Sequence, residues 1–235
     1  MPKRYLFVDC LDTVGRAVVD AVAGTAGEGA VHRLQAMGRD GDERPAGGLV
    51  AGADIKRAAA EHGPFDVIVI GPPIVDESEM IDADSRPNEA VIEAIDSAAK
   101  RSLDILQAAL LVSLDRGDAQ IWSLGLDDAF AYYLEGMPVA PIVTQTRVSC
   151  MRTLSREYAR MGVRLNSAIF QPPADMVSAD ALKKGRKDLK TYSMRHKLVD
   201  ADRQASLLTG YLAADALALN GATLCLGTGV NEFNI

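Results

Sequence analysis

Short apolar runs rich in β-branched residues alternate with longer amphipathic stretches along this chain, and that alternation constrains its fold more than any other feature. The order is typical of a parallel sheet with helices on both faces, because each strand returns to the same edge through a helix. Seven runs are predicted as strands: Tyr5–Val8, Ala30–Leu34, Gly48–Ala51, Phe65–Ile70, Ala119–Leu124, Arg164–Ile169 and Thr223–Leu226. We therefore predict an α/β fold with a doubly wound, seven-stranded parallel sheet in one domain spanning residues 1–235.

Three helices are predicted with particular clarity between these runs. Apolar residues at three- and four-residue spacing indicate one long helix: Val91, Ile92, Ile95, Ala99, Leu103, Leu106 and Leu110. Pro141 fits the first turn of a second helix ending near Tyr158, where a missing N–H costs nothing. A third helix carries Leu207, Leu208, Leu212 and Ala216, and Asn220-Gly221 provides a stop before the final strand.

Composition excludes several functional classes. With 235 residues, 48% of them hydrophobic, the chain can bury a core without disulfides or a structural metal. Its three cysteines are far apart, and its three histidines form no metal-binding motif, so no metal site is predicted. A net charge of −7 argues against non-specific nucleic-acid binding. No run approaches the roughly 20 apolar residues of a membrane span, and no signal peptide is apparent, so we expect a cytoplasmic protein without a membrane partner.

The second half of the chain carries the most specific sequence resemblance. Arg152-Thr-Leu-Ser-Arg-Glu-Tyr-Ala-Arg-Met-Gly-Val-Arg-Leu-Asn166 and Gly221-Ala-Thr-Leu-Cys-Leu-Gly-Thr-Gly229 are similar to segments of the short-chain dehydrogenase/reductase family, and the order of elements matches over nearly the whole chain. This resemblance implies a Rossmann-like fold. It also implies a dinucleotide site outside the carboxyl ends of the strands.

The residues that would bind the dinucleotide are nevertheless changed. The family's first turn reads T-G-x-x-x-G-x-G, and with its last glycine on Gly15 the other two glycines fall on Asp9 and Thr13. A carboxylate about 4 Å from a phosphate costs on the order of 4 kcal/mol, and both Asp9 and Asp12 stand in this turn. We expect these two acids to cap the following helix instead. Pro72-Pro73 likewise replaces the family's adenine-side motif, so we predict that this chain binds no cofactor.

The four catalytic positions that the resemblance implies are also altered. The family's asparagine falls on Ala98, its serine at or beside Leu126, its tyrosine on Ala140 and its lysine on Thr144. A slipped alignment does not explain the loss, because none of the six tyrosines is followed four residues later by a lysine. No G-x-G-x-x-G is present either. Without a phenol activated by an ammonium group, no proton donor for hydride-transfer chemistry is in place.

These losses predict a non-catalytic subunit of a dehydrogenase complex. The resemblance implies that the two long helices pair across subunits, so we expect this chain to join a catalytically active relative, as a hetero-oligomer of the dimer-of-dimers kind with NAD(P) bound in the partner. The interface is predicted at Ile142, Val143, Thr146, Cys150, Met151 and Leu154. A hydroxyacyl-CoA or ketoacyl-CoA substrate is consistent with the basic segment from Lys183 to Lys197, which alternatively docks an acidic partner.

Two alternatives remain open at the level of sequence. The first is a divergent oxidoreductase, or a non-redox lyase or isomerase, whose acid–base groups would be Asp127, Tyr132, Tyr133 and Glu135. The second is a ligand-sensing regulator with the same fold. The acidic segment Asp76, Glu77, Glu79, Asp82 and Asp84 is interpreted as a solvated loop.

Overall fold

The computed structural model describes residues 3–34, 50–80, 85–128, 134, 137, 139–192, 198–214 and 219–227, with the backbone alone for 186–192. Six strands in these residues form one sheet, and every neighbouring pair is parallel. Their order across the sheet is β2-β1-β3-β4-β5-β6. The bounds are Tyr5–Val8 for β1, Val31–Leu34 for β2, Val67–Ile70 for β3, Ala119–Leu126 for β4, Val163–Phe170 for β5 and Thr223–Leu226 for β6.

The doubly wound parallel sheet is confirmed, but the seventh predicted strand is wrong. Val50 and Ala51 lie outside any strand, and Ala51 is the N-cap of a helix that starts at Gly52. The first two residues of that predicted strand, 48 and 49, lie outside the described residues. The described residues of this run, Val50 and Ala51, therefore form the segment that leads into helix α2.

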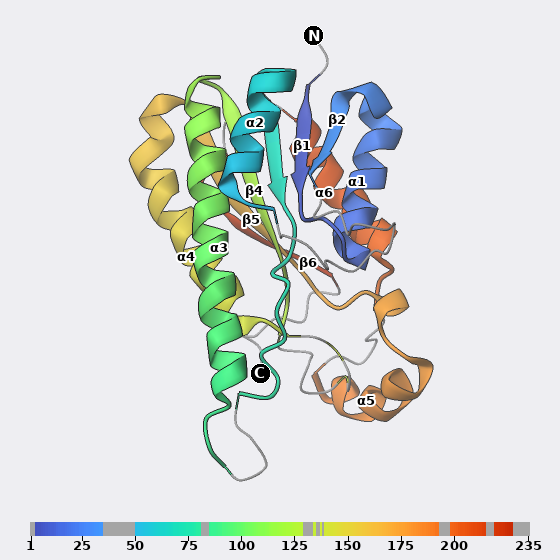
Figure 1. Cartoon of the computed structure of the whole chain (residues 1–235). Coiled ribbons are helices and arrows are strands. Elements are labelled where there is room, and N and C mark those ends of the chain that lie inside the picture. Colours follow the sequence, from blue (N-terminus) through green and yellow to red (C-terminus); the bar gives the residue numbers. More distant parts are fainter. Residues whose placement is uncertain are drawn as a thin grey trace, which may run out of the picture.

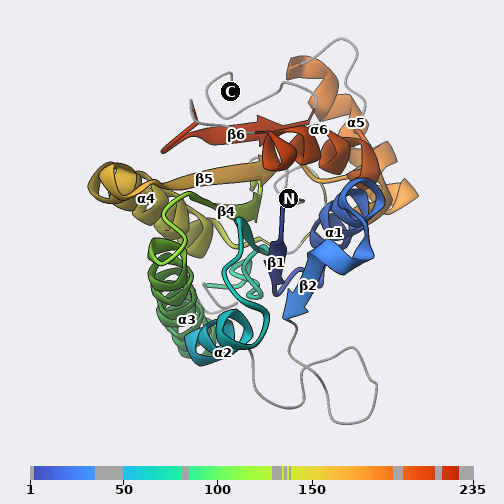
Figure 2. The same cartoon turned by 90° about the horizontal axis from the view of Figure 1, so that it is seen from above.

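Helices cover both faces of the sheet (Figure 2). One face carries α1 (Thr13–Ala26) and α6 (Ala201–Ala213), and the other carries α2 (Gly52–His62), α3 (Glu89–Leu114) and α4 (Pro141–Tyr158). Helix α5 (Ala179–Tyr192) lies beyond the end of the sheet to which the arrow of β1 points (Figure 1). Three-residue 3₁₀ turns are present at Glu28–Ala30, Ala159–Met161 and Ala174–Met176. No helix in these described ranges is long and apolar enough to cross a membrane.

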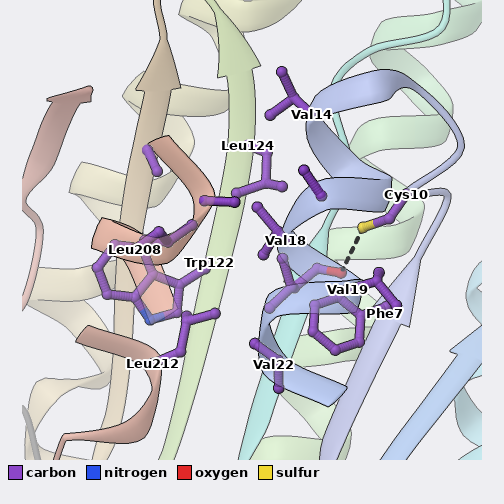
Figure 3. Packing of buried hydrophobic residues seen from close by; sticks show 14 of the residues in the cluster. Phe7, Cys10, Val14, Val18, Val19, Val22, Trp122, Leu124, Leu208 and Leu212 are labelled. Carbon is purple, nitrogen blue, oxygen red and sulfur yellow. Dashed lines mark hydrogen bonds between the residues drawn. The ribbon is translucent and has the colours of Figure 1, made fainter. Parts of the chain in front are cut away.

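Burial of the sheet on both faces explains why its strands are almost continuously apolar. In β1, Tyr5 and Phe7 belong to the core beneath α1 and α6, whereas Leu6 and Val8 belong to the core beneath α2, α3 and α4. On the first face Trp122 packs beside Leu208 and Leu212 of α6 (Figure 3). These two cores hold the strands rigidly and so fix the loops that leave the carboxyl ends.

The chain reverses its direction of winding at β1, with β2 on one side and β3 on the other. In sheets of this kind, ligands bind outside the carboxyl ends of the strands at such a switch point. The backbones after β1 and β3 approach closely there, because a Cβ on Gly71 would lie only 2.2 Å from the carbonyl oxygen of Asp9. Residue 71 must therefore be glycine, and the segments after β1 and β3 are held together as one wall.

Candidate functional site

A cleft of about 450 Å³ opens at this switch point. Its apolar lining consists of Leu11, Pro72, Pro73, Ile74, Val75, Leu126, Ala140 and Met176. Its polar lining consists of Asp9, Asp12, Asp76 and Thr144. The volume lies within the range of small-molecule sites, and the position is the one that this fold class uses for ligands. We take this cleft as the candidate functional site.

The N-terminus of α1, which faces this cleft, is capped by the chain itself. Asp12 has the extended backbone of an N-cap residue, and its Oδ1 accepts a hydrogen bond of 2.9 Å from the N–H of Gly15. The sequence prediction that Asp12 caps this helix is confirmed. A carboxylate here satisfies the helix dipole from within the chain, at the place where a dinucleotide pyrophosphate is bound in this fold class. Thr13 is the first residue of the helix and is exposed, whereas Gly15, two residues later, is buried.

The cap gives a direct stability prediction. Asp12→Ala should lower the free energy of unfolding by about 1 kcal/mol, because the N–H of Gly15 loses its partner. Asp12→Asn should change it far less, since an amide oxygen caps a helix about as well as a carboxylate does. Urea denaturation of the two variants side by side measures this difference, and equal losses in both would mean that the cap contributes little.

Asp9 does not cap the helix, so that part of the sequence prediction is wrong. Its side chain turns inward, and its Oδ2 accepts a hydrogen bond of 2.6 Å from Nη1 of Arg101 on α3. Asp9 is only 4% exposed and holds a left-handed backbone with φ of 53°, which favours glycine. The family's glycine position is thus occupied by a buried acid in an ion pair, and nothing local in the sequence signalled Arg101 as its partner.

A second arginine completes this buried charge cluster. Arg147 on α4 is buried and donates a hydrogen bond of 2.8 Å from Nη2 to the carbonyl oxygen of Gly71. Burial and the neighbouring charge of Arg101 lower the pKa of Arg147 to about 10, so it stays protonated at neutral pH. Burial raises the pKa of Asp9, and the attraction of Arg101 and Arg147 only partly offsets that effect. The cluster therefore ties α3 to the segment after β1 through Asp9, and α4 to the segment after β3 through Gly71.

The N-terminus of α4 is also capped by a carboxylate. Glu77 is only 2% exposed, and its Oε2 and Oε1 accept hydrogen bonds from the N–H groups of Ile142 (2.7 Å) and Val143 (3.0 Å). The interpretation of the acidic segment as a solvated loop is therefore wrong for Glu77. Asp76 beside it is exposed and lines the cleft. No local sequence pattern distinguished Glu77 from its acidic neighbours.

These residues do not fit a dinucleotide. A pyrophosphate needs free N–H groups and a glycine-lined turn, but Asp12 occupies the helix terminus, and the carboxylate of Asp9 replaces a glycine. Pro72 and Pro73, in the second wall of the cleft, have no N–H to donate to an adenine. Within the described ranges, no group of three or more histidine, cysteine or acidic residues is placed to bind a metal.

The structure places three of the four family catalytic positions around this one cleft. Leu126 ends β4, and Ala140 and Thr144 lie at the start of α4. Ala98 on α3 is buried against Val143 and is not among the residues that line the cleft. None of the four side chains exchanges a proton with a carbonyl or an alcohol in the way a phenol next to an ammonium does. The alternative acid–base residue Asp127 is half-buried after β4, and Tyr132, Tyr133 and Glu135 lie outside the described residues.

Part of the predicted interface is wrong. Val143 and Met151 are buried in this chain's own cores and are unavailable to a partner. Of the rest, Ile142 is 44% exposed, and Thr146, Cys150 and Leu154 are partly exposed. On the basic segment, Lys183 and Lys184 lie exposed on α5, and the side chains from 186 to 197 lie outside the described ones.

A larger hollow, of about 1130 Å³, lies at the opposite edge of the sheet. Its charged lining is already paired, because Arg116 binds Asp66 and Lys3 donates to the carbonyl oxygen of Ala214. The N–H of Arg4 also donates to Asp66. Because ligands in doubly wound folds bind at the carboxyl edge, we assign the functional site to the smaller cleft.

Comparison with known proteins defines the fold. No family model and no curated protein sequence matches this chain. Among solved structures, an NADPH-dependent reductase, YwfH, involved in bacilysin biosynthesis, is 13% identical with a TM-score of 0.60, covering 95% of this chain and 96% of that one. The ligand-free aldohexose dehydrogenase of Thermoplasma acidophilum is 12% identical (TM-score 0.65; coverage 95% and 92%). TT0495 from Thermus thermophilus is 16% identical (TM-score 0.63; coverage 97% of both chains). The chain therefore has the Rossmann-like fold of these proteins over almost its whole length.

Proposed function

We propose that this chain is a non-catalytic subunit with a dehydrogenase fold, which pairs with a catalytically active, NAD(P)-dependent relative. The observation that carries the proposal is which residues line the cleft. Leu126, Ala140 and Thr144 stand where a proton-transferring set is expected, and Asp12 caps the helix where a pyrophosphate is expected. A chain that keeps the fold while losing both functions is retained for a role other than hydride transfer in its own cleft.

Exposed apolar side chains support pairing through α3 and α4. Ile92, Leu103 and Leu111 of α3 are between 42% and 47% exposed, and Ile142 of α4 is similarly exposed. The two helices pack side by side on the same face of the sheet, as Figure 2 shows. Because symmetric oligomers reuse one surface, a degenerate copy can replace an active subunit on such a face without a new interface.

The proposed complex acts on a hydroxyacyl-CoA or ketoacyl-CoA substrate. Lys183 and Lys184 are exposed on α5, which lies at the carboxyl end of the sheet, and lysine side chains bind phosphates such as those of a CoA ester. In its lost motifs the chain resembles the non-catalytic subunit of 2-(α-hydroxybenzyl)succinyl-CoA dehydrogenase. The alternative role of this basic helix is to bind an acidic segment of the partner.

Coexpression with an intact dehydrogenase tests the pairing, and a dehydrogenase encoded beside this chain would be the first choice of partner. Size-exclusion chromatography with light scattering should show a complex that contains both chains, and the sister alone should be less active or less stable. If this chain ran as a 25.0 kDa monomer both alone and when coexpressed with the dehydrogenase, the proposal would be contradicted.

We predict that the isolated chain binds neither NADH nor NADPH with a dissociation constant below about 100 μM, because Asp12 caps the helix terminus that a pyrophosphate needs and Asp9 replaces a glycine of the turn. Calorimetry measures this directly. Thermal denaturation is a second measurement, since a ligand at 100 times its dissociation constant adds about 2.7 kcal/mol of stability. Restoring glycines with Asp9→Gly and Thr13→Gly should not produce reductase activity, as Ala140 and Thr144 still supply no proton. Tight binding to the unmodified chain would favour the divergent oxidoreductase instead.

A further inference from the structure

Two of the chain's three histidines lie ring against ring. His32 is in strand β2, and His62 is the last residue of helix α2. Their ring centroids are 4.5 Å apart, with an angle of 31° between the ring planes. Strand β2 is at the edge of the sheet and, among the described residues, pairs only with β1. The ring contact therefore joins the C-terminal end of α2 to this edge strand.

The surroundings hold His32 more firmly than His62. His32 is in register with Leu6, whose side chain belongs to the core beneath α2, α3 and α4, so His32 points to the same face of the sheet. The buried ring of Phe65 contacts the ring of His32 edge-on, with the centroids 5.3 Å apart. His32 is half-buried, whereas the side chain of His62 is 47% exposed. Of the two rings, that of His62 is therefore the one with space to move.

A permanent cation lies beside the pair. Nη1 of Arg4 donates a hydrogen bond to the carbonyl oxygen of His62, and the charge of Arg4 also acts on His32. Asp66, the acid that faces Arg4, accepts hydrogen bonds from the N–H of Arg4 and from Nη2 of Arg116. Because Asp66 is already paired with Arg116, its negative charge does not compensate a positive charge on the imidazoles.

The other charged groups around the pair are exposed. Oε2 of Glu61 is 4.0 Å from Nε2 of His62, but the side chain of Glu61 is 59% exposed, so solvent screens its attraction. Arg33, the next residue of β2, points to the opposite face of the strand, where it lies 3.8 Å from Asp20 and 3.7 Å from Glu28. Protonation of both rings therefore places three cations together with little compensation.

The arrangement makes this contact depend on pH. Burial, the neighbouring His62 and the charge of Arg4 lower the pKa of His32 below its ordinary value of 6.5. A histidine whose pKa is lower in the folded than in the unfolded state binds its proton more weakly when folded. The stability that this contact contributes is therefore lost as pH falls from about 6.5 through the lower folded-state pKa.

We propose that the contact between His32 and His62 is a proton-sensitive joint, which opens in mildly acidic solution and releases the C-terminal end of α2 from β2. When both rings are charged, they repel each other and Arg4. The exposed ring of His62 moves away, because Phe65 and the sheet hold His32 in place. None of these residues lines the candidate cleft or belongs to α3 or α4. The joint therefore goes beyond the proposed function and does not depend on the pairing.

Amide hydrogen exchange of the whole isolated chain, followed by NMR, tests the joint. The N–H of Gly63 donates a hydrogen bond of 2.9 Å to the carbonyl oxygen of Ala59, so it reports on the end of α2. After correction for the pH dependence of intrinsic exchange, its protection should fall at least about 10-fold between about pH 7.5 and about pH 5.5.

A second amide in the same sample distinguishes local opening from global unfolding. The N–H of Gly71 donates a hydrogen bond of 2.8 Å to the carbonyl oxygen of Val8 in the centre of the sheet, and its protection should stay the same over this pH range. Protection of Gly63 that does not change with pH, or that falls only together with that of Gly71, would overturn the proposal.

Variants assign the opening to the two rings. His62→Gln and His32→Gln each keep a polar side chain that cannot be protonated, so in either variant the fall in protection should shrink to less than about 2-fold. In His62→Gln the pKa of His32, followed by the chemical shifts of its ring, should rise because a neighbouring positive charge is lost. Lys56→Gln removes a positive charge from an exposed position on α2 and is the control, which should open as the unmodified chain does. If both histidine variants open like this control, or if the pKa of His32 is the same with and without His62, the proposal fails.

Discussion

Replacing Arg101 by methionine should lower the free energy of unfolding by about 3–5 kcal/mol, a large fraction of the roughly 5–15 kcal/mol that stabilises a typical domain. The reason is the buried carboxylate of Asp9, which accepts a 2.6 Å hydrogen bond from Arg101 and is 4% exposed. Methionine keeps the packing of the arginine stem but leaves that charge without its closest counterion. Urea denaturation followed by circular dichroism measures the loss.

The adjacent residue provides a matched control. Lys100 on the same helix forms an exposed ion pair of 2.6 Å with Asp96, one turn away. Lys100→Met removes the same unit of charge, but solvent screens that exposed pair, so stability should change far less than in Arg101→Met. If the two variants lost equal stability, the Asp9–Arg101 pair would contribute no more than a surface pair does.

The dependence of this loss on pH identifies Asp9 as its source. Burial already raises the pKa of Asp9 in the folded chain, and loss of Arg101 should raise it further. An acid whose pKa is higher in the folded than in the unfolded state binds its proton more tightly when folded. The stability of the protein therefore falls as pH rises from the unfolded-state pKa through the folded-state pKa, and it is regained on acidification. The gap between the Arg101→Met variant and the unmodified chain should therefore narrow from about pH 7 towards about pH 4. A gap that does not change with pH would assign the loss to packing.

The fold was predictable because its signals are periodic and local. Six of the seven predicted strands and the helix from Pro141 to Tyr158 are confirmed, since each depends on the spacing of apolar residues within one segment. The exception is Gly48–Ala51, whose last residue is the cap of α2. Four apolar or small residues are too few to distinguish a strand from the approach to a helix.

The candidate site was predictable only where its contacts are short in sequence. Asp12 was predicted as a helix cap because the N–H group it accepts from lies three residues away. The ion pair of Asp9 was not predicted, because its partner Arg101 lies 92 residues further along the chain and is brought to it by the packing of α3. Glu77 was misinterpreted for the same reason, since it caps a helix that starts more than 60 residues later. Tertiary contacts of this kind leave no periodic trace in one sequence.

Leu103→Glu should separate the proposed complex while leaving this chain folded. Leu103 is 47% exposed on α3, so a glutamate there is solvated in the free subunit and costs little. Buried against a partner, the same unpaired charge must be desolvated, and we expect the dissociation constant to rise at least 100-fold, or about 2.7 kcal/mol. Light scattering of the coexpressed pair should show single subunits, and the activity that depends on the complex should fall.

A second exposed leucine tests whether this effect belongs to one face. Leu207 on α6 is 60% exposed and lies on the opposite side of the sheet from α3. Leu207→Glu makes the same chemical change, so it should leave a complex formed through α3 and α4 intact. Thr146→Glu, at a partly exposed position on α4, should in contrast separate the subunits as Leu103→Glu does. Assembly that survives both α3 and α4 substitutions but fails with Leu207→Glu would move the interface to α6, because a buried charge disrupts only the face that it enters.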